Sequence, residues 1–248
     1  MSPIKVLYAG DSPVGGSANY LLAILKFVKA RVTHLPPAQK LKPSLLKSHF
    51  DVIVLSDYPK RQVPRASEKA VVKQVDDGAG FLMAGGWASF SGPAGKWHGS
   101  LIEGQVLPVV CSPGDDRVTF PGGAHLVLKQ KHAVLDLISL TPSPAIIGIN
   151  EVYPKMDGSV LITTRKIVSV RSQLVLDPTE YPLLVVSRDS KKRVAAFCTD
   201  LAPHWCGGLV DWGNRHIRLS VNPRIHIAVG DTYVHFLSSL LLWLAGQK

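Results

Sequence analysis

The chain has 248 residues, a formal net charge of +10 and a hydrophobic content of 46%. This composition, with 19% charged residues, is typical of a chain that buries a sizeable core and excludes an intrinsically disordered protein. Length alone allows one large α/β domain or two small ones. The three cysteines have no CxxC spacing and are odd in number. They argue against a disulfide framework and fit reduced thiols.

Neither end of the chain predicts a targeting or membrane segment. The first residues, MSPIKVLYAG, lead straight into a strand, without the basic and apolar regions of a secretory signal. The late apolar run FLSSLLLWLAG is too short to cross a bilayer. We therefore expect a cytoplasmic protein with no membrane partner.

One basic block stands out. Residues 20–50 contain six Lys or Arg residues and no Asp or Glu. Such a block could attract nucleic acid or an acidic surface. No nucleic-acid-binding motif accompanies it, so we interpret it as a solvated basic face and do not predict a nucleic-acid partner.

The first ninety residues alternate predicted strands and helices. Apolar, β-rich runs predict strands at residues 4–10, 50–59 and 80–86. Helices are predicted over 17–30, with Ser17 as the N-cap, and over 66–78, ended by Gly78. Buried apolar strands separated by helices indicate an α/β fold with a central, mostly parallel sheet and helices on both faces.

The pattern loosens after Pro93. Two β-rich runs around the turn RDSKKR predict a hairpin over residues 183–197. The last predicted helix, over residues 231–246, carries leucines and Phe236 along one face and should dock on the sheet. Because the sequence has no internal repeat and no convincing linker, we predict a single domain over residues 1–248.

Three loops should meet at one edge of the sheet, where ligands bind in parallel α/β proteins. They are residues 10–17, 56–60 and 85–92, which bring Asp11, Asp57, Trp87 and Ser89 together. The first loop, GDSPVGGS, has the glycines and serine of a phosphate-binding loop. However, Gly16 stands where that motif needs a lysine. We therefore favour a structural turn over nucleotide hydrolysis.

Several stretches resemble a known family. GGWASF (residues 85–90) and DLAPHW (200–205), with DVIVLSD, the segment 76–100 and DWGN, are similar to the glutamine amidotransferase-like proteins. These belong to the class I glutamine amidotransferase-like superfamily, which also includes the ThuA-like proteins. The resemblance covers about residues 4–246. It implies a flavodoxin-like, three-layer α/β/α sandwich, and it implies no established reaction by itself.

The resemblance also locates a missing nucleophile. In true class I amidotransferases, a cysteine stands on the elbow after a strand and works with a late His–Glu pair. Laid over FLMAGGW, this elbow puts Gly85 at or next to the nucleophile position. Glycine has no thiol to attack the amide carbon of glutamine, and no late His-x-Glu pair is present. We predict that the chain has no glutaminase activity.

Other nucleophiles have weaker signals. Cys206 follows His204 by two residues and is the one thiol near a plausible base. Its alternative role is packing, because a reactive cysteine needs an electropositive, partly exposed setting. Ser89 lacks the G-x-S-x-G frame of a serine elbow. The weak catalytic candidates are therefore His204 and Cys206.

A metal would need several ligands to converge. The sequence offers side chains at predicted loops and element ends: His98, His125, His132, His204, Asp11, Asp57, Glu151 and Asp200. No pair has HExxH spacing, so we predict no metal site and no cofactor. His204 is the histidine of most interest, because DLAPHW combines a carboxylate, a proline turn, an imidazole and an indole. The structural alternative is an Asp200 cap and a Trp205 that fills the core.

Two functions stay open from the sequence. The first is a non-glutaminase protein that binds a small polar ligand, such as a sugar or a carboxylate, at the strand ends. Its predicted ligand-binding residues are Asp11, Asp57, Gly85, Gly86, Trp87, Ser89 and His204. The second is a hydrolase-like enzyme in the same cleft, with His204 as base or with a bound metal.

Three tryptophans in predicted loops favour a homo-oligomer. Trp97, Trp205 and Trp212 are of the type enriched at buried interfaces. The competing explanation is that these loops fold back over the sheet edge and bury the indoles within one subunit.

Overall fold

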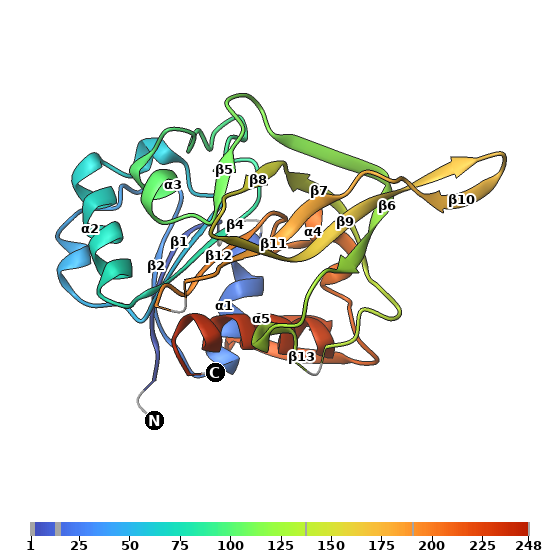
Figure 1. The fold of residues 1–248 in the computed structure, drawn as a ribbon. Helices are drawn as coiled ribbons and strands as arrows, with labels where there is room; N and C mark the ends of the chain where they lie inside the picture. The colour runs from blue at the N-terminus through green and yellow to red at the C-terminus, as the bar shows by residue number, and fades with distance from the viewer. Residues whose placement is uncertain (1–2, 13–15, 137, 190, 248) are drawn as a thin grey trace.

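A ten-stranded mixed sheet forms the centre of the computed structural model, which describes residues 3–12, 16–136, 138–189 and 191–247 (Figure 1). The strand order is β2-β1-β3-β4-β12-β11-β9-β6-β7, and β10 pairs with β9. The strands of this sheet are β1 (Lys5–Gly10), β2 (Arg31–Leu35), β3 (Val52–Ser56), β4 (Gly80–Ala84), β6 (Arg117–Leu128), β7 (Ala145–Asn150), β9 (Gly158–Val170), β10 (Gln173–Leu176), β11 (Tyr181–Ser187) and β12 (Val194–Phe197). Two small sheets pair β5 (Val109–Cys111) with β8 (Val152–Pro154) and β13 (His216–Asn222) with β14 (Ile225–Gly230).

The core of the sheet is parallel, as predicted. β2, β1, β3, β4 and β12 all run in the same direction. β3 and β4 are buried along their whole lengths, which explains their continuous apolar sequences. From β11 onward the neighbours pair antiparallel, so the looser second half of the sequence forms the antiparallel part. The predicted hairpin is confirmed, because β11 and β12 pair antiparallel.

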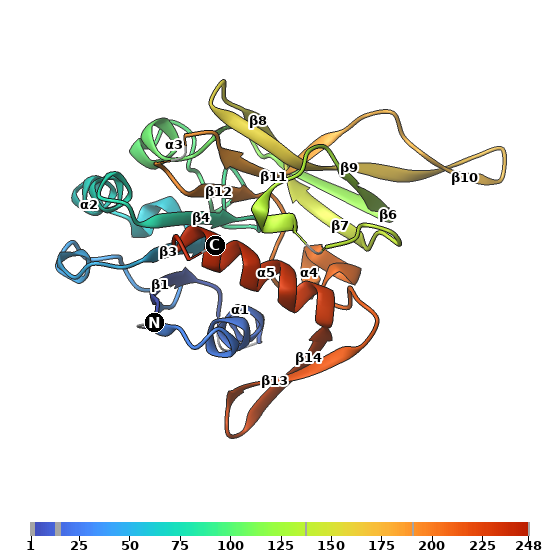
Figure 2. The same ribbon diagram turned by 60° about the horizontal axis from the view of Figure 1, so that its bottom comes forward.

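Helices cover both faces of the parallel part (Figure 2). The helices are α1 (Ser17–Phe27), α2 (Arg65–Asp76), α3 (Leu101–Gln105), α4 (Pro203–Cys206) and α5 (Asp231–Leu244). Alternate residues of each strand feed two cores: Val6 and Val54 lie in the same core as α1 and α5, while Leu7 and Ile53 lie in the core that α2 and α3 complete. The predicted α/β class and the docking of the last helix are thereby confirmed. None of the described helices combines the length and apolarity needed to cross a bilayer.

One strand was not predicted, and one local expectation was wrong. Residues 31–35 form strand β2, which we did not predict. β2 lies at the end of the sheet and is partly exposed, so its sequence lacks the apolar run of a buried strand. Ser17 is the first residue of α1, and the cap position belongs to Gly16, whose φ of 89° is a left-handed conformation that glycine adopts without strain.

The three tryptophans are buried within one chain. Trp97 is fully buried, and Trp205 and Trp212 are 6% and 7% exposed. The Trp97 indole N–H donates to the Tyr58 carbonyl at 3.0 Å, which satisfies its polar edge. The loops therefore bury their own indoles, and a homo-oligomer has to be argued from another surface.

Candidate functional site

Four parallel strands end side by side at one edge of the sheet. Gly10 pairs with Ser56, Ser56 with Ala84, and Ala84 with Phe197. The residues that follow β1, β3, β4 and β12 therefore meet at the carboxyl edge, the usual place for a ligand in such sheets. These residues include three carboxylates, Asp11, Asp57 and Asp200.

Asp11 is buried with one oxygen unsatisfied. Asp11 is 3% exposed. Its Oδ2 accepts a 2.6 Å hydrogen bond from the Tyr8 hydroxyl. Its Oδ1 has no hydrogen-bond partner among the described residues. Burial, followed by the nearby Asp57 carboxylate, raises the pKa of Asp11 to about 7. The folded environment of Asp11 therefore disfavours its ionised form.

The turn that presents Asp11 is tight. Gly10 has φ +117°, and a Cβ there would lie 1.6 Å from the Ser56 carbonyl oxygen. Asp11 itself has φ 39°, which is uncommon for a residue with a side chain. Its N–H donates to the same Ser56 oxygen at 3.0 Å. Strained geometry of this kind at the end of a strand is typical of functional sites.

Asp57 sits on a second strained turn. Its φ is 48°, and its N–H donates to the hydroxyl of Ser89 at 3.0 Å. Its Oδ1 accepts the N–H of Ala88 at 2.8 Å. Burial raises the pKa of Asp57, while the Ala88 N–H and the His204 imidazole lower it. Ser89 is 1% exposed, so its hydroxyl positions Asp57.

Asp200 brings the third carboxylate from β12. It is 4% exposed, and its Oδ1 accepts the N–H of Ala202 at 2.9 Å. Burial raises the pKa of Asp200 well above the ordinary value, with further increases from Asp11 and Asp57. The three carboxyl groups therefore influence one another, and full ionisation of the cluster is unfavourable.

His204 lies above this cluster, one helical turn after Asp200. Its Nδ1 is 4.0 Å from Asp200 Oδ2, and its side chain is 69% exposed. The imidazole therefore combines solvent access with a buried carboxylate partner. The two residues lie four apart in DLAPHW, and at 4.0 Å their side chains are neighbours without a direct hydrogen bond.

The glycine turn after β4 has no room for side chains. A Cβ on Gly85 would lie 2.6 Å from the Cys198 carbonyl oxygen, and a Cβ on Gly86 would lie 2.1 Å from Asp57 Oδ1. Both contacts are far shorter than real Cβ contacts. The Asp57 carboxylate thus fills the space that a side chain of residue 86 would take.

The backbone N–H groups of the same turn are already used. Gly85 N–H points at the Phe197 and Thr199 carbonyls at 2.8 and 2.9 Å, and Gly86 N–H donates to Asn150 Oδ1 at 2.8 Å. Neither group is free to stabilise an oxyanion, which needs unoccupied donors.

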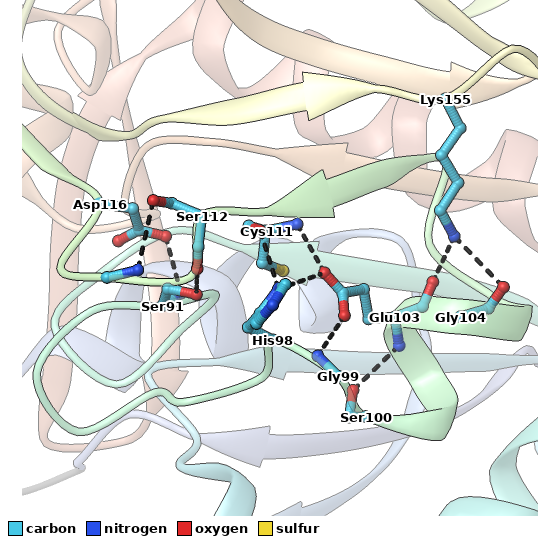
Figure 3. A network of polar contacts seen from close by, with 11 residues as sticks. Ser91, His98, Gly99, Ser100, Glu103, Gly104, Cys111, Ser112, Asp116 and Lys155 are labelled. Carbon is cyan, nitrogen blue, oxygen red and sulfur yellow. Dashed lines mark hydrogen bonds and ion pairs between the residues drawn. The ribbon is translucent and has the colours of Figure 1, made fainter.

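A buried polar network fixes the loop that follows. Asn150 Nδ2 donates to the Gly86 carbonyl at 3.2 Å and to Asp116 Oδ1 at 2.7 Å. Asp116 Oδ2 accepts the N–H of Ser91 at 2.7 Å, and the Ser91 hydroxyl donates to the Ser112 carbonyl (Figure 3). These bonds tie the glycine turn to β7 and the start of β6, so the position of Asp57 depends on both halves of the sheet.

A second part of this network surrounds Glu103. Its carboxylate accepts the N–H groups of Cys111, at 2.7 Å, and Gly99, and it lies 3.4 Å from His98 Nδ1 (Figure 3). His98 Nδ1 is also 3.0 Å from the Cys111 carbonyl, so it must carry a proton to donate to either oxygen. Burial, then the Glu103 charge, raises the pKa of Cys111 above its usual range. These contacts indicate a structural role for the cluster, because both carboxylate oxygens of Glu103 accept a hydrogen bond.

Trp87 directly follows the glycine turn. It is 57% exposed, and the Arg117 guanidinium carbon lies 4.3 Å from its ring centre. Arg117 also makes a two-atom ion pair with Asp115, with a shortest distance of 2.7 Å. One face of the indole is therefore occupied by a cation, and the other is accessible as a stacking surface.

A groove of about 590 Å³ opens beside His204. Its wall combines polar and apolar residues from α1, α4, β7 and β14, among them Ser17, Tyr20, His204, His226 and Ile227. The groove lies on the His204 side of the carboxylate cluster. Residues 13–15 of the predicted glycine-rich loop lie outside the described residues.

The cysteines have the properties of packing residues. All three are buried and free. The Cys206 thiol donates to the Ala202 carbonyl at 3.0 Å, and burial raises its pKa well above the ordinary value. A protonated, buried thiol is a poor nucleophile. Across the described ranges, no three His, Cys, Asp or Glu side chains are grouped so that they could hold a metal ion.

The structure brings most of the predicted site residues to one edge. Asp11, Asp57 and Ser89 lie at the strand ends, as the alternating pattern predicted, and Gly85 and Gly86 form the turn beside them. His204 reaches this edge from α4, and Trp87 is exposed. Sequence reasoning missed Tyr8, Asn150 and Asp116, which hold this site from within strands or from the antiparallel half. A polar residue at the end of an apolar run, as in IIGIN, is the signal that could have found Asn150.

Comparisons with known proteins agree with this architecture. Residues 14–223 match the family model described as "Putative glutamine amidotransferase". Two Salmonella typhimurium structures are similar in fold. The cytoplasmic protein STM1381 has a TM-score of 0.72 at 21% identity, covering 97% of this chain and 99% of that chain. The cytoplasmic protein STM3548 has a TM-score of 0.71 at 22% identity, covering 97% and 98%.

A comparison with curated proteins gives no match. The family match extends over most of the chain and includes both strand-end motifs, GGWASF and the residues around Asp200. The chain therefore belongs to the putative glutamine amidotransferase family, within the class I glutamine amidotransferase-like fold.

Proposed function

We propose that this protein binds a small polar ligand, rich in hydrogen-bond donors, at the carboxyl edge of its parallel strands. The observation that carries the proposal is the convergence of Asp11, Asp57 and Asp200, with a buried Asp11 oxygen that no described residue satisfies. Unsatisfied buried acceptors are rare and unfavourable. A ligand that donates to this oxygen would remove that penalty.

The electrostatics support a binding role over a structural one. Burial raises the pKa of all three carboxyl groups, and repulsion from neighbouring carboxylates raises the pKa of Asp11 and Asp200 further. The folded state therefore resists their ionisation. Such groups cluster at functional sites, where a ligand or reaction uses the unfavourable charge. His204, exposed and close to Asp200, offers a titratable partner.

The same electrostatics select the ligand class. Three neighbouring carboxyl groups repel a carboxylate ligand, so that class is disfavoured. Hydroxyl groups of a sugar-like ligand, or an ammonium group, would donate to the carboxylate oxygens. Within this proposal Ser89, Gly85 and Gly86 act as positioning residues, and the free face of Trp87 stacks on the ligand's apolar part.

We expect ethanolamine or myo-inositol to raise the unfolding temperature in a thermal-shift assay, and glutamate or citrate to leave it unchanged. Asp57→Asn should abolish the increase, because Asp57 is partly exposed, whereas Asp11 and Asp200 are buried, so a ligand reaches Asp57 first. Asp76→Asn is the matched control, since Asp76 is a surface acid paired with Lys192 at 2.8 Å. A ligand response that persists in Asp57→Asn, or one given only by the carboxylates, would contradict the proposal.

We also propose that the protein has no glutaminase activity. The support is the pair of glycines at the elbow, which offer neither a thiol nor free N–H donors. Purified protein incubated with glutamine should release no ammonia above background. Ammonia release that is lost in one of Cys111→Ser, Cys198→Ser or Cys206→Ser would reveal a relocated nucleophile and overturn this expectation.

A hydrolase-like reaction in the same cleft is the second candidate. The observation in its favour is the Asp200–His204 pair, because a carboxylate beside an imidazole can orient a general base. If this candidate holds, His204→Ala removes turnover of a screened ester or glycoside substrate but leaves ligand stabilisation in place.

We further propose that the chain works as a single domain over residues 1–248, in the cytoplasm.

A further inference from the structure

Two adjacent pockets lie along β2, the strand at the end of the sheet (Figure 1). The small pocket has a volume of about 240 Å³ and the large pocket about 620 Å³. Leu45 lines both of them, so the two are neighbours. Neither lining includes a residue of the carboxylate site, so these pockets form a separate place on the molecule.

The small pocket is lined mainly by groups that attract an anion. Its lining consists of Lys5, Arg31, Thr33, Leu45, Ser48, His49 and Phe50. This set combines an ammonium group, a guanidinium group, an imidazole and two hydroxyl groups, all of which can donate to the oxygens of an anion. The lining includes no acidic side chain.

The register of the sheet places two of these cations side by side. Lys5 of β1 pairs directly with Arg31 of β2, and neighbouring strands lie about 4.8 Å apart. Both residues are exposed, and neither side chain makes an ion pair with a described residue. Like charges at paired positions repel each other. An anion between the two side chains would replace this repulsion with two favourable contacts.

The acidic residue next to this pocket leaves both cations available. Asp51 Oδ2 accepts the backbone N–H of Lys5 at 2.6 Å, and its Oδ1 lies 3.8 Å from His49 Nε2. The carboxylate therefore contacts a backbone amide and an imidazole. Because two permanent cations, Lys5 and Arg31, stand against this single carboxylate, the small pocket keeps a positive charge.

The wall that carries Ser48 and His49 is fixed from within the protein. Gln74 of α2 is 6% exposed. Its side-chain amide donates to the Leu46 and Ser48 carbonyls at 2.9 and 2.8 Å, and its Oε1 accepts the N–H of Phe50 at 3.1 Å. One buried side chain thus holds this wall at three points. A preorganised wall of this kind loses little entropy when a ligand binds.

The large pocket continues the same pattern of charge. Its lining consists of Leu35, Gln39, Lys40, Lys42, Ser44 and Leu45, with two more lysines and no acid. Neither lysine makes an ion pair with a described residue. Arg31, Lys40 and Lys42 all belong to the basic block of residues 20–50, so half of its six cations line these two pockets.

We propose that the two pockets bind a phosphorylated small molecule with two anionic groups. One phosphoryl group lies between Lys5 and Arg31, where its oxygens accept from guanidinium, ammonium and hydroxyl donors together. The second anionic group contacts Lys40 or Lys42. Small-molecule sites usually have volumes of about 300–1,000 Å³, so the small pocket fits one group and the rest of the ligand needs the large pocket.

The linings favour a small molecule over a nucleic acid. Proteins that bind single strands stack bases on exposed aromatic side chains. The one Phe, Tyr or Trp in either lining is Phe50, and it is buried. The cations are therefore gathered in two pockets without a stacking surface beside them.

Isothermal titration calorimetry with inorganic phosphate and with fructose 1,6-bisphosphate, at about 0.15 M salt, tests the proposal. The bisphosphate should bind about tenfold more tightly than phosphate, because it reaches both pockets. Arg31→Ala should weaken both probes about tenfold, whereas the double variant Lys40→Ala, Lys42→Ala should weaken only the bisphosphate. Arg224→Ala is the matched control, because Arg224 is exposed in the turn between β13 and β14 and lines neither pocket.

A variant that keeps the charge separates a built site from general attraction. Thr33→Val preserves the β-branched shape that suits a strand and removes one hydroxyl donor, so it should weaken phosphate binding about threefold. Because the replaced residues are exposed, their unfolding temperatures without ligand should match the unmodified protein. Asp57→Asn should leave phosphate binding unchanged, which separates this test from that of the carboxylate site.

Three results would overturn the proposal. The first is the absence of binding by either probe at millimolar concentration. The second is equal weakening in Arg31→Ala and Arg224→Ala, which would show that the anions only screen the net charge. The third is tight binding of a single-stranded oligonucleotide without binding of the bisphosphate, which would assign this face to a nucleic acid.

Discussion

Replacing Gly85 by cysteine is expected to destabilise the protein and to create no glutaminase. A Cβ at this position would lie 2.6 Å from the Cys198 carbonyl oxygen, 2.7 Å from the Cys198 carbonyl carbon and 2.9 Å from Asn150 Oδ1. Two of these atoms belong to the backbone, so no rotamer relieves the contact. Overpacking of this kind lowers the free energy of unfolding by roughly 1–3 kcal/mol. Thermal unfolding should show a decrease of about 2–4 °C for each kcal/mol.

The chain offers a matched control for that variant. Gly104 lies in α3, and a Cβ there would meet nothing within 4 Å. Gly104→Ala should leave the unfolding temperature unchanged or raise it, because alanine favours a helix. If Gly85→Cys folds with unchanged stability and releases ammonia from glutamine, the turn after β4 adapts to a nucleophile and our view of the elbow is wrong.

The parallel half of the fold could be predicted because burial alone accounts for the sequences of its central strands. β3 and β4 are buried on both faces, so every residue is under the same selection for apolarity, and the runs DVIVLS and GFLMA stand out. β2 could not be found in this way, because it lies at the end of the sheet and is only partly buried. Arg31, Thr33 and other polar residues of β2 hide the pattern.

The site could be predicted only where it depends on local sequence. Asp11 and Asp57 directly follow buried strands, so the strand-end rule places them. Asn150 and Asp116 come from the antiparallel half, and their contact with the glycine turn spans 64 and 25 residues of sequence, to Gly86 and Ser91 respectively. No periodicity signals such long-range polar contacts. The tryptophans illustrate the same limit. A tryptophan buried by a folded-back loop and one buried at an interface look the same in the sequence.

Asp11→Asn is expected to stabilise the protein at pH 8 and to have little effect at pH 4. The folded state raises the pKa of Asp11 from 3.8 to about 7. A carboxyl group with a raised folded-state pKa contributes its full stability below pH 3.8. This contribution is lost as the pH rises through 7, because the folded state must then release a proton that it holds tightly. Asparagine is neutral at every pH and avoids this loss.

The size of the effect follows from the shift. Three pKa units correspond to at most about 4 kcal/mol, and coupling to Asp57 and Asp200 reduces this to roughly 1–3 kcal/mol in a single variant. Urea unfolding of both proteins from pH 4 to pH 8 measures the difference. Asp115→Asn is the control, because its pKa is lowered by Arg117 and its effect should be small and opposite in sign. A wild-type protein that matches Asp11→Asn at pH 8 would show that Asp11 ionises without penalty. The carboxylate cluster would then lose its main support as a binding site. In a binding site that stores unfavourable charge, removing that charge should raise the stability of the protein and lower its affinity for the ligand.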